Sequence, residues 1–202
     1  MNNKVKRTIK AVVLLCLAMF MLAGCARTPK PVNEIWSKEL TEDQMEIVEL
    51  LSSNRHEILL FDYKTEEGFR SVEFWLEVYE KGVLVSQPVG VITFRDEAKP
   101  ADGQLAVIIS KGDSFQWIFT MGEDGAKMTS SGESPRVREA FGNAYGPVSE
   151  KITITDGEEF VLYTSIYASD GIAHSDRQRY AKQPELLAEY PYAYIIKGKF
   201  SK

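Results

Sequence analysis

Alternating apolar and polar side chains dominate the chain from residue 57 to its C-terminus. Between residues 69 and 79, for example, Val72, Phe74 and Leu76 occupy every second position, as in a strand with one buried face. Short segments rich in Gly, Pro and Asp separate such runs, which is typical of hairpin turns. The pattern therefore predicts nine or ten strands, within residues 57–63, 69–79, 83–86, 89–94, 105–110, 114–121, 126–130, 151–155, 160–168 and 192–200.

Pairs that contain glycine mark the predicted turns, because glycine, and to a lesser degree Asp, tolerates left-handed backbone conformations. Oxygen-rich loops of this kind also bind Ca²⁺, but the spacing Asp-x-Asp-x-Asp-Gly is absent, so the pattern favours turns. Residues 131–147 and 170–182 are predicted to be loops, the first with one helical turn at residues 137–141. The predicted turns are Glu67-Gly68, Lys81-Gly82, Asp102-Gly103, Gly112-Asp113, Asp124-Gly125 and Asp156-Gly157.

Two helices are predicted among these strands. Thr41 and Gln44 have the spacing of a capping box, and Met45, Val48 and Leu51 share one face of a helix over residues 41–53. A short helix over residues 184–189 begins at a proline, which the first turn tolerates. Strands and helices do not alternate, so we expect an antiparallel β-sandwich with an N-terminal helix and a short C-terminal helix. A closed β-barrel is the alternative.

The N-terminus has the layout of a secretory signal peptide. Four cations and no acid occur in the first ten residues, and thirteen consecutive apolar residues follow at 11–23. As a helix this run would span about 20 Å, which is short for a hydrocarbon core of about 30 Å. A membrane anchor or a buried core helix is the alternative, although upstream cations are unusual for a core helix.

The end of this segment, Leu22-Ala23-Gly24-Cys25, resembles the lipobox of bacterial lipoprotein precursors. The resemblance covers only the first 25 residues. It implies a diacylglyceryl group on the sulfur of Cys25, cleavage between Gly24 and Cys25, and acylation of the new amine. Two or more acyl chains anchor a protein firmly, whereas one does not. Ordinary signal cleavage near Ala23, leaving a free secreted protein, is the alternative.

The expected organisation is a signal peptide at residues 1–24, a lipidated tether at residues 25–34 and a single β-rich domain at residues 35–202. Pro29 and Pro31 and the lack of apolar periodicity indicate the tether. Roughly ten residues reach about 35 Å at full extension, so the domain would stay close to its membrane.

Charge and cysteine content narrow the function classes. Residues 1–24 hold four of the 24 cations and none of the 29 acids, so the mature chain has a net charge of −9. This charge, without a basic stripe, argues against nucleic acid and favours cationic peptides or basic proteins as partners. Cys16 lies in the signal segment, so the mature chain keeps only Cys25. An intramolecular disulfide and a cysteine nucleophile are therefore excluded for the mature domain.

Catalytic motifs are absent from the sequence. His56 and His174 are the only histidines, and no metal-ligand, phosphate-loop or nucleophile-elbow spacing occurs. His174 has Ser and Asp neighbours, but catalytic triads assemble in space, so adjacency gives no support. We expect neither histidine to be catalytic, and we predict no metal and no cofactor.

Alternating aromatic residues are the remaining candidates. Phe115, Trp117 and Phe119 share one face and are predicted to belong to the core. Tyr190, Tyr192 and Tyr194 also alternate, and an exposed row of tyrosines would suit a glycan or peptide ligand. Tyrosines that cover a half-exposed sheet edge are the alternative.

These observations predict an exported protein, lipid-anchored to the outer face of the cytoplasmic membrane, or to an outer membrane if the cell has one. Its membrane contact would be the lipid on Cys25. We expect a non-enzymatic binding or accessory module for a peptide, protein or other envelope component. The alternatives are an envelope hydrolase with an unrecognised site and a structural subunit of an envelope complex.

Overall fold

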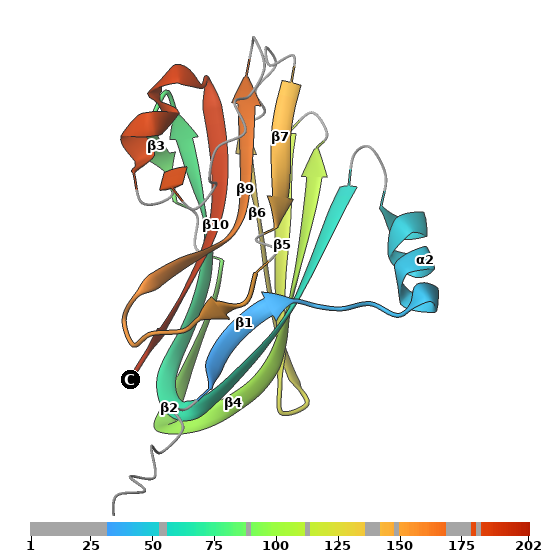
Figure 1. Cartoon of the computed structure of the whole chain (residues 1–202), viewed down its shortest axis with the longest axis vertical. Helices are drawn as coiled ribbons and strands as arrows, with labels where there is room; N and C mark the ends of the chain where they lie inside the picture. The colour runs from blue at the N-terminus through green and yellow to red at the C-terminus, as the bar shows by residue number, and fades with distance from the viewer. Residues whose placement is uncertain are drawn as a thin grey trace, which may run out of the picture. The chain divides into compact units, whose positions relative to one another are not determined.

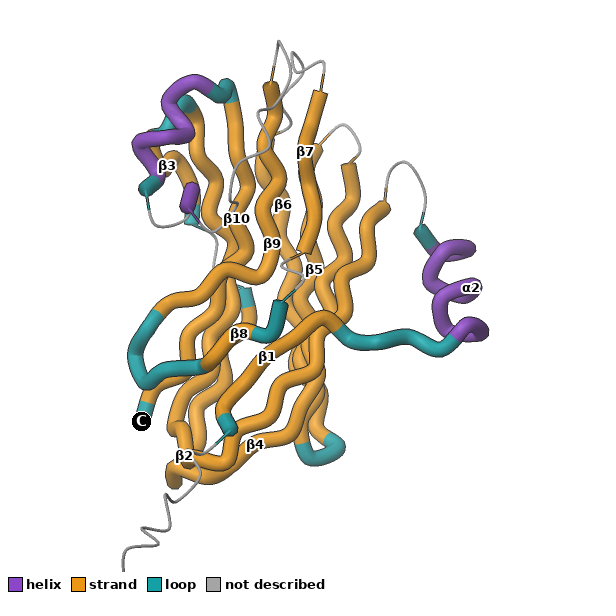
Figure 2. Tube along the Cα trace, viewed as in Figure 1, coloured by secondary structure: helices purple, strands orange, loops and turns teal. Residues whose placement is uncertain are grey.

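The computed structural model describes residues 32–52, 56–87, 90–111, 114–135, 142–147, 150–168, 179–180 and 183–202. Within these residues ten strands join into one antiparallel sheet, and Figure 2 shows how few of the described residues are helical. The main path of the sheet has the strand order β6-β5-β4-β2-β10-β9-β7. The strands are β1 (Asn33–Ser37), β2 (His56–Glu80), β3 (Val83–Ser86), β4 (Val91–Lys111), β5 (Ser114–Glu123), β6 (Ala126–Pro135), β7 (Gly142–Pro147), β8 (Ile152–Thr153), β9 (Glu159–Ala168) and β10 (Tyr192–Ser201).

The long strand β2 changes neighbours along its length. Its first half pairs with β1, from Asn33 opposite Thr65 to Ser37 opposite Phe61, and its second half pairs with β10 along the same edge. Because one edge of β2 carries two different neighbours, the sheet bends into two layers (Figure 1). The first half of β2 continues through β4 into β5 and β6, and the second half continues through β10 into β9 and β7.

A bulge in β4 accompanies the bend. Residues 95–98 of β4 lie opposite a single residue of β2. A Cβ atom on Gly68 would lie 2.7 Å from the carbonyl carbon of Ala98, so a larger residue would displace the bulge. The predicted turn at Glu67-Gly68 is therefore wrong: Gly68 allows a close approach of two backbones within a continuous strand.

Side chains from both layers meet in one core. Phe200 of β10 is fully buried in it, with its ring centroid 5.5 Å from those of Tyr63 and Phe69 and 6.1 Å from those of Phe74 and Phe160. The prediction of a mainly β, antiparallel fold is confirmed. The closed-barrel alternative is wrong, because the main path ends at β6 and β7, and no pairing joins these two strands in the described part of the chain.

Two of the predicted turns are confirmed by their backbone conformation. Lys81 and Gly82 have φ values of 50° and 78°, and Asp124 and Gly125 have values of 51° and 79°. Both connections therefore have the left-handed residues that tight hairpins require. Gly112-Asp113 lies outside the described residues.

Other predicted connections are wrong. Asp102-Gly103 lies inside β4, where a Cβ atom on Gly103 would come within 2.3 Å of the Tyr63 ring. The predicted loop at residues 131–147 contains the end of β6 and all of β7. Asp156-Gly157 does not join a hairpin, since β8 pairs with β1. β1 itself was not predicted, and it begins two residues before the expected start of the domain.

The predicted helices are confirmed. In α2 (Glu42–Leu51), the Gln44 amide donates to Thr41 Oγ1 at 3.3 Å and the Thr41 amide donates to Gln44 Oε1 at 3.1 Å, which completes the capping box. The 3₁₀ helix η1 (Pro184–Glu189) buries Leu187 in a second apolar cluster. No helix among the described residues is long and apolar enough to cross a membrane.

Candidate functional site

A buried carboxylate on the outer face of β2 is the first candidate. Glu77 and Lys197 form an ion pair with 2.9 Å between Oε2 and Nζ, and their side chains are only 6% and 9% exposed. Trp75 Nε1 donates to Glu77 Oε1 at 3.1 Å, and the Tyr79 hydroxyl donates to Glu77 Oε2 at 2.7 Å. Three donors on two strands therefore hold this carboxylate, which we call the Glu77 cluster.

Strand periodicity and pairing assemble the Glu77 cluster. Residues 75, 77 and 79 point away from the core because Phe74, Leu76 and Val78 point into it. Trp75 lies directly opposite Lys197 in the β2–β10 ladder. Burial raises the pKa of the Tyr79 hydroxyl well above its usual range, and the hydrogen bond to Glu77 and the charge of that carboxylate raise it further. Tyr79 therefore stays a neutral donor at physiological pH.

A pocket of about 210 Å³ opens beside the Glu77 cluster. Lys199 Nζ lies 3.6 Å from Glu73 Oε1, and Lys197 Nζ lies 3.2 Å from Glu159 Oε2. Both lysines are thus paired within the protein. The residues that line the pocket are Glu73, Phe74, Trp75, Gln87, Ile92, Glu159 and Lys199.

The chemistry of the pocket favours a ligand with a positive charge. Glu73 and Glu159 have side chains that are 26% and 51% exposed, so their remaining oxygens can accept hydrogen bonds from a ligand. An indole at the wall, from Trp75, also attracts cations. An ammonium or guanidinium group could donate to the two carboxylates and also lie against the Trp75 ring.

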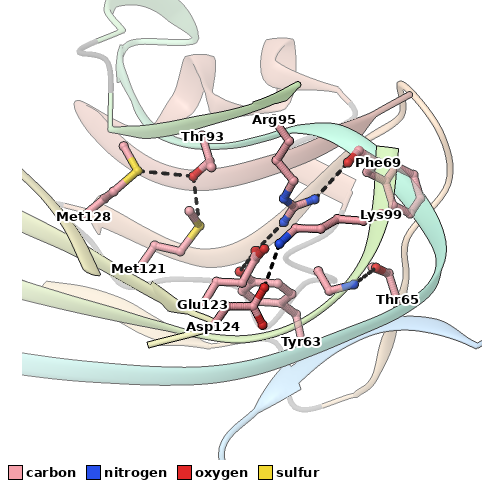
Figure 3. Close-up of polar contacts among 11 residues, drawn as sticks. Tyr63, Thr65, Phe69, Thr93, Arg95, Lys99, Met121, Glu123, Asp124 and Met128 are labelled. Carbon is pink, nitrogen blue, oxygen red and sulfur yellow. Dashed lines mark hydrogen bonds and ion pairs between the residues drawn. The ribbon is translucent and has the colours of Figure 1, made fainter. Parts of the chain in front are cut away.

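A second polar cluster lies where the two layers meet (Figure 3). Arg95, from the bulge of β4, forms an ion pair with Glu123 of β5, and the two side chains are 7% and 10% exposed. Tyr63 donates to Glu123 Oε2 at 2.9 Å, and Arg95 Nη1 donates to the Phe69 carbonyl at 2.9 Å. This Arg95 cluster ties the bulge to the far side of the core.

Contacts around the Arg95 cluster support a structural role. The Thr93 hydroxyl lies 3.8 Å from the sulfur of Met121 and 3.5 Å from that of Met128 (Figure 3). Lys99 and Asp124 form an exposed ion pair at 2.7 Å, and the hydrogen bond from Lys99 lowers the pKa of Asp124. These contacts join the first half of β4 to β5 and β6, so the cluster ties the two layers together on this side of the sandwich.

Only one of the two histidines lies in the described part of the chain. His56 is exposed at the start of β2, with Nδ1 2.9 Å from Ser110 Oγ. His174, Gly24 and Cys25 lie outside the described residues. In the described part of the chain, no group of three or more His, Cys, Asp or Glu side chains is placed to hold a metal ion.

The predicted row of ligand-facing tyrosines is not an exposed row. Tyr194 is 1% exposed and belongs to the core between the layers, whereas Tyr190 is 9% exposed and belongs to the second apolar cluster. The Tyr190 hydroxyl lies 3.2 Å from that of Tyr180, and this hydrogen bond and burial raise the pKa of Tyr190 to about 12. Only Tyr192 is half-buried, so the three side chains do not present one surface.

The residues of the Glu77 cluster were not singled out from the sequence. The outward positions of residues 69–79 alternate acids and aromatics, and Lys197 and Lys199 alternate in the last strand. Both patterns are visible in the sequence, but their pairing depends on β10 lying beside β2. Trp117 and Phe119 are buried in the core as predicted, whereas the side chain of Phe115 lies outside the described residues.

The comparisons with known proteins identify a family and no individual relative. No curated protein and no solved structure matches this chain. The YgaN domain matches residues 34–200, a segment that extends from β1 to the end of β10 and includes both polar clusters. Because this match covers well over half of the sequence, the chain belongs to the YgaN domain family.

Proposed function

We propose that this protein is a lipid-anchored cell-envelope protein whose β domain is a non-enzymatic binding module for a cationic segment of another envelope protein or peptide. The lipobox at Leu22-Ala23-Gly24-Cys25 supports export and anchoring. β1 begins at Asn33, so the chain between Cys25 and the sheet is short. The domain would therefore work within about 30 Å of the membrane surface.

Anchoring is tested by Cys25→Ser. The serine hydroxyl cannot form the thioether, so we expect complete loss of acyl label and of membrane retention, with the protein left uncleaved or released. The measurement is metabolic labelling with a fatty-acid analogue, followed by detergent partitioning. A shorter, acyl-labelled form of the Cys25→Ser variant in the detergent phase would contradict the lipobox assignment.

The pocket beside the Glu77 cluster is the observation that carries the binding proposal. Lys199 in its lining and the neighbouring Lys197 already have carboxylate partners, whereas the half-exposed Glu73 and the exposed Glu159 keep acceptor capacity. The net charge of −9 that the mature chain would carry attracts cationic ligands over long range. Charge-assisted hydrogen bonds to the pocket carboxylates would then fix a Lys or Arg side chain.

Calorimetric titration with a Lys/Arg-rich peptide tests this proposal. We expect saturable binding that weakens with salt, and Glu159→Gln should weaken it about tenfold, corresponding to about 1.4 kcal/mol. Glu158→Gln is the matched control, because it removes the same charge from an exposed neighbour outside the pocket lining. Equal weakening by both variants, or equal affinity for a Glu-rich peptide, would contradict a carboxylate site in the pocket.

A further inference from the structure

The apolar side of α2 is exposed. Its centre is Ile47 and Leu51, which are one turn apart and 56% and 64% exposed, while Met45 and Leu50, 46% and 79% exposed, lie nearer the acidic side, and no residue of the helix is buried. In Figure 1 the helix projects from the sheet at the end of an extended connection. Isolated helices of this length are marginal in water, and an amphipathic helix gains most of its stability by covering its apolar side. α2 therefore needs a surface to pack against.

A matching apolar surface lies on the outer face of the sheet. Ile58 of β2, Ile108 of β4 and Ile118 of β5 lie directly opposite one another in the two ladders. They point away from the core, because Leu59, Val107, Ile109 and Phe119 occupy the alternate, buried positions. We call these three residues the isoleucine row.

The isoleucine row is open and uncharged. Ile118 is 37% exposed, while Ile58 and Ile108 are half-buried. Leu60 and Ala106, also half-buried, lie opposite one another on the same face and widen the row. Beyond it the outer positions of β5 are Gln116 and Thr120. This face also carries Asp62, which is paired with Lys38 at 3.2 Å, and the exposed Glu133 of β6, which lies opposite Gln116. The row itself holds no charge, so an acidic helix can lie on it with its acids turned away from the sheet.

We propose that two copies of this chain form a two-fold dimer in which α2 of each copy covers the isoleucine row of the other. Each chain has both an exposed α2 and an exposed isoleucine row. A two-fold pair therefore covers both surfaces of both copies at once. Two such contacts would bury on the order of 1,200 Å² in total, which reaches the lower end of stable interfaces. This interface is independent of the pocket and of its proposed ligand.

The charge distribution favours this occupant over a membrane surface. Glu42, Asp43, Glu46 and Glu49 lie in α2, and the helix contains no cation. Membrane-surface helices carry Lys and Arg on the polar side, because anionic headgroups repel acids. In the dimer the isoleucine row contacts only the apolar side of α2, so the acidic side of the helix faces water.

Cysteine pairing between two tagged copies of the full chain tests the dimer. One copy carries Ile47→Cys and the other Ile118→Cys, and both are expressed together in a bacterial host and oxidised. We expect a mixed disulfide band that contains both tags, at least ten times stronger than with the matched pair Glu49→Cys and Ile118→Cys. Glu49 follows Ile47 by two residues and so lies on the opposite side of α2. The parent chains give the background of Cys16 and Cys25.

A second measurement uses wild-type copies with the two tags and scores their co-purification. Ile47→Glu should abolish co-purification without unfolding, since Ile47 is 56% exposed, whereas Glu49→Gln should not change it. A mixed band at the control level would overturn the dimer. So would an Ile47→Cys, Ile118→Cys chain that forms its disulfide only within one copy, because α2 would then cover its own sheet.

Discussion

Lys197→Met is expected to lower the free energy of unfolding by about 3 to 5 kcal/mol at neutral pH, the range for breaking a buried ion pair by removing one partner. Glu77 would keep its hydrogen bonds from Trp75 and Tyr79 but lose its cation at 2.9 Å. For a chain of this size the melting temperature should fall by roughly 10 °C. Urea unfolding and thermal melts, followed by circular dichroism, measure both quantities.

A double variant identifies the cause of this loss. In Lys197→Met the carboxylate of Glu77 would stay buried without a cation beside it, and an uncompensated buried charge is strongly destabilising. Glu77→Gln in the Lys197→Met background should restore most of the stability, because the Gln oxygen accepts from Trp75 Nε1 and its amide N–H₂ can donate to the Tyr79 oxygen, without the charge. No recovery in the double variant would show that lysine packing, not charge, is lost.

Lys199→Met is the matched control on the same strand and the same face. Lys199 and Glu73 lie 3.6 Å apart, and their side chains are 29% and 26% exposed. Solvent screens a pair of this kind, so its loss should cost less than about 1 kcal/mol. Equal destabilisation by the two lysine substitutions would contradict the importance of burial in the Glu77 cluster.

Alkaline solution is expected to unfold the domain cooperatively above about pH 10, the usual pKa of tyrosine. Burial raises the pKa of Tyr63, Tyr163 and Tyr194 far above their usual range. Nearby carboxylates strengthen the effect, since Tyr63 donates to Glu123 at 2.9 Å and Tyr163 donates to Glu57 at 2.7 Å.

The direction of this pH effect follows from how many protons the tyrosines bind in the folded and the unfolded states. Below about pH 10 these hydroxyls are protonated in both states, so their stabilisation is complete. Above it the unfolded chain loses protons that the folded chain retains, and each tyrosine costs about 1.4 kcal/mol per pH unit. These three tyrosines alone remove about 4 kcal/mol per pH unit, and Tyr79 and Tyr190, whose pKa values are also raised, add to this loss, which exhausts an ordinary folding stability within a few pH units.

Tyrosinate absorbance and circular dichroism, recorded together during an alkaline titration, measure this transition. The absorbance step of the buried tyrosines should coincide with loss of β structure, and Tyr163→Phe should reduce the slope by about 1.4 kcal/mol per pH unit. All tyrosines ionising near pH 10 with the sheet intact would contradict the burial of these hydroxyls.

Local patterns in the sequence predicted much of the fold correctly. The capping box of Thr41 and Gln44, the hairpin at Asp124-Gly125 and the core positions of Trp117 and Phe119 depend on residues close together in the chain. Alternation with a period of two was enough to predict an antiparallel β fold, because it reports one buried face wherever the strand lies.

The errors arose where a residue's role depends on a distant strand. Gly68 and Gly103 were predicted to lie in turns, but each lies in a continuous strand beside a group from elsewhere, Ala98 or the Tyr63 ring. β1 is short and has little alternation, so its pairing with β2 was not visible. A glycine in the sequence does not by itself reveal whether it forms a turn or makes room in a strand for a neighbouring backbone or side chain.

Tertiary structure alone decided the candidate site. Glu77 and Lys197 are 120 residues apart, and only the pairing of β10 with β2 brings them within 2.9 Å. Burial of Tyr190 and Tyr194 in different clusters likewise follows from which face of the sheet each side chain meets. Local patterns indicate which side of a strand is apolar, whereas the choice of neighbouring strands depends on the free energy of the whole packed sheet.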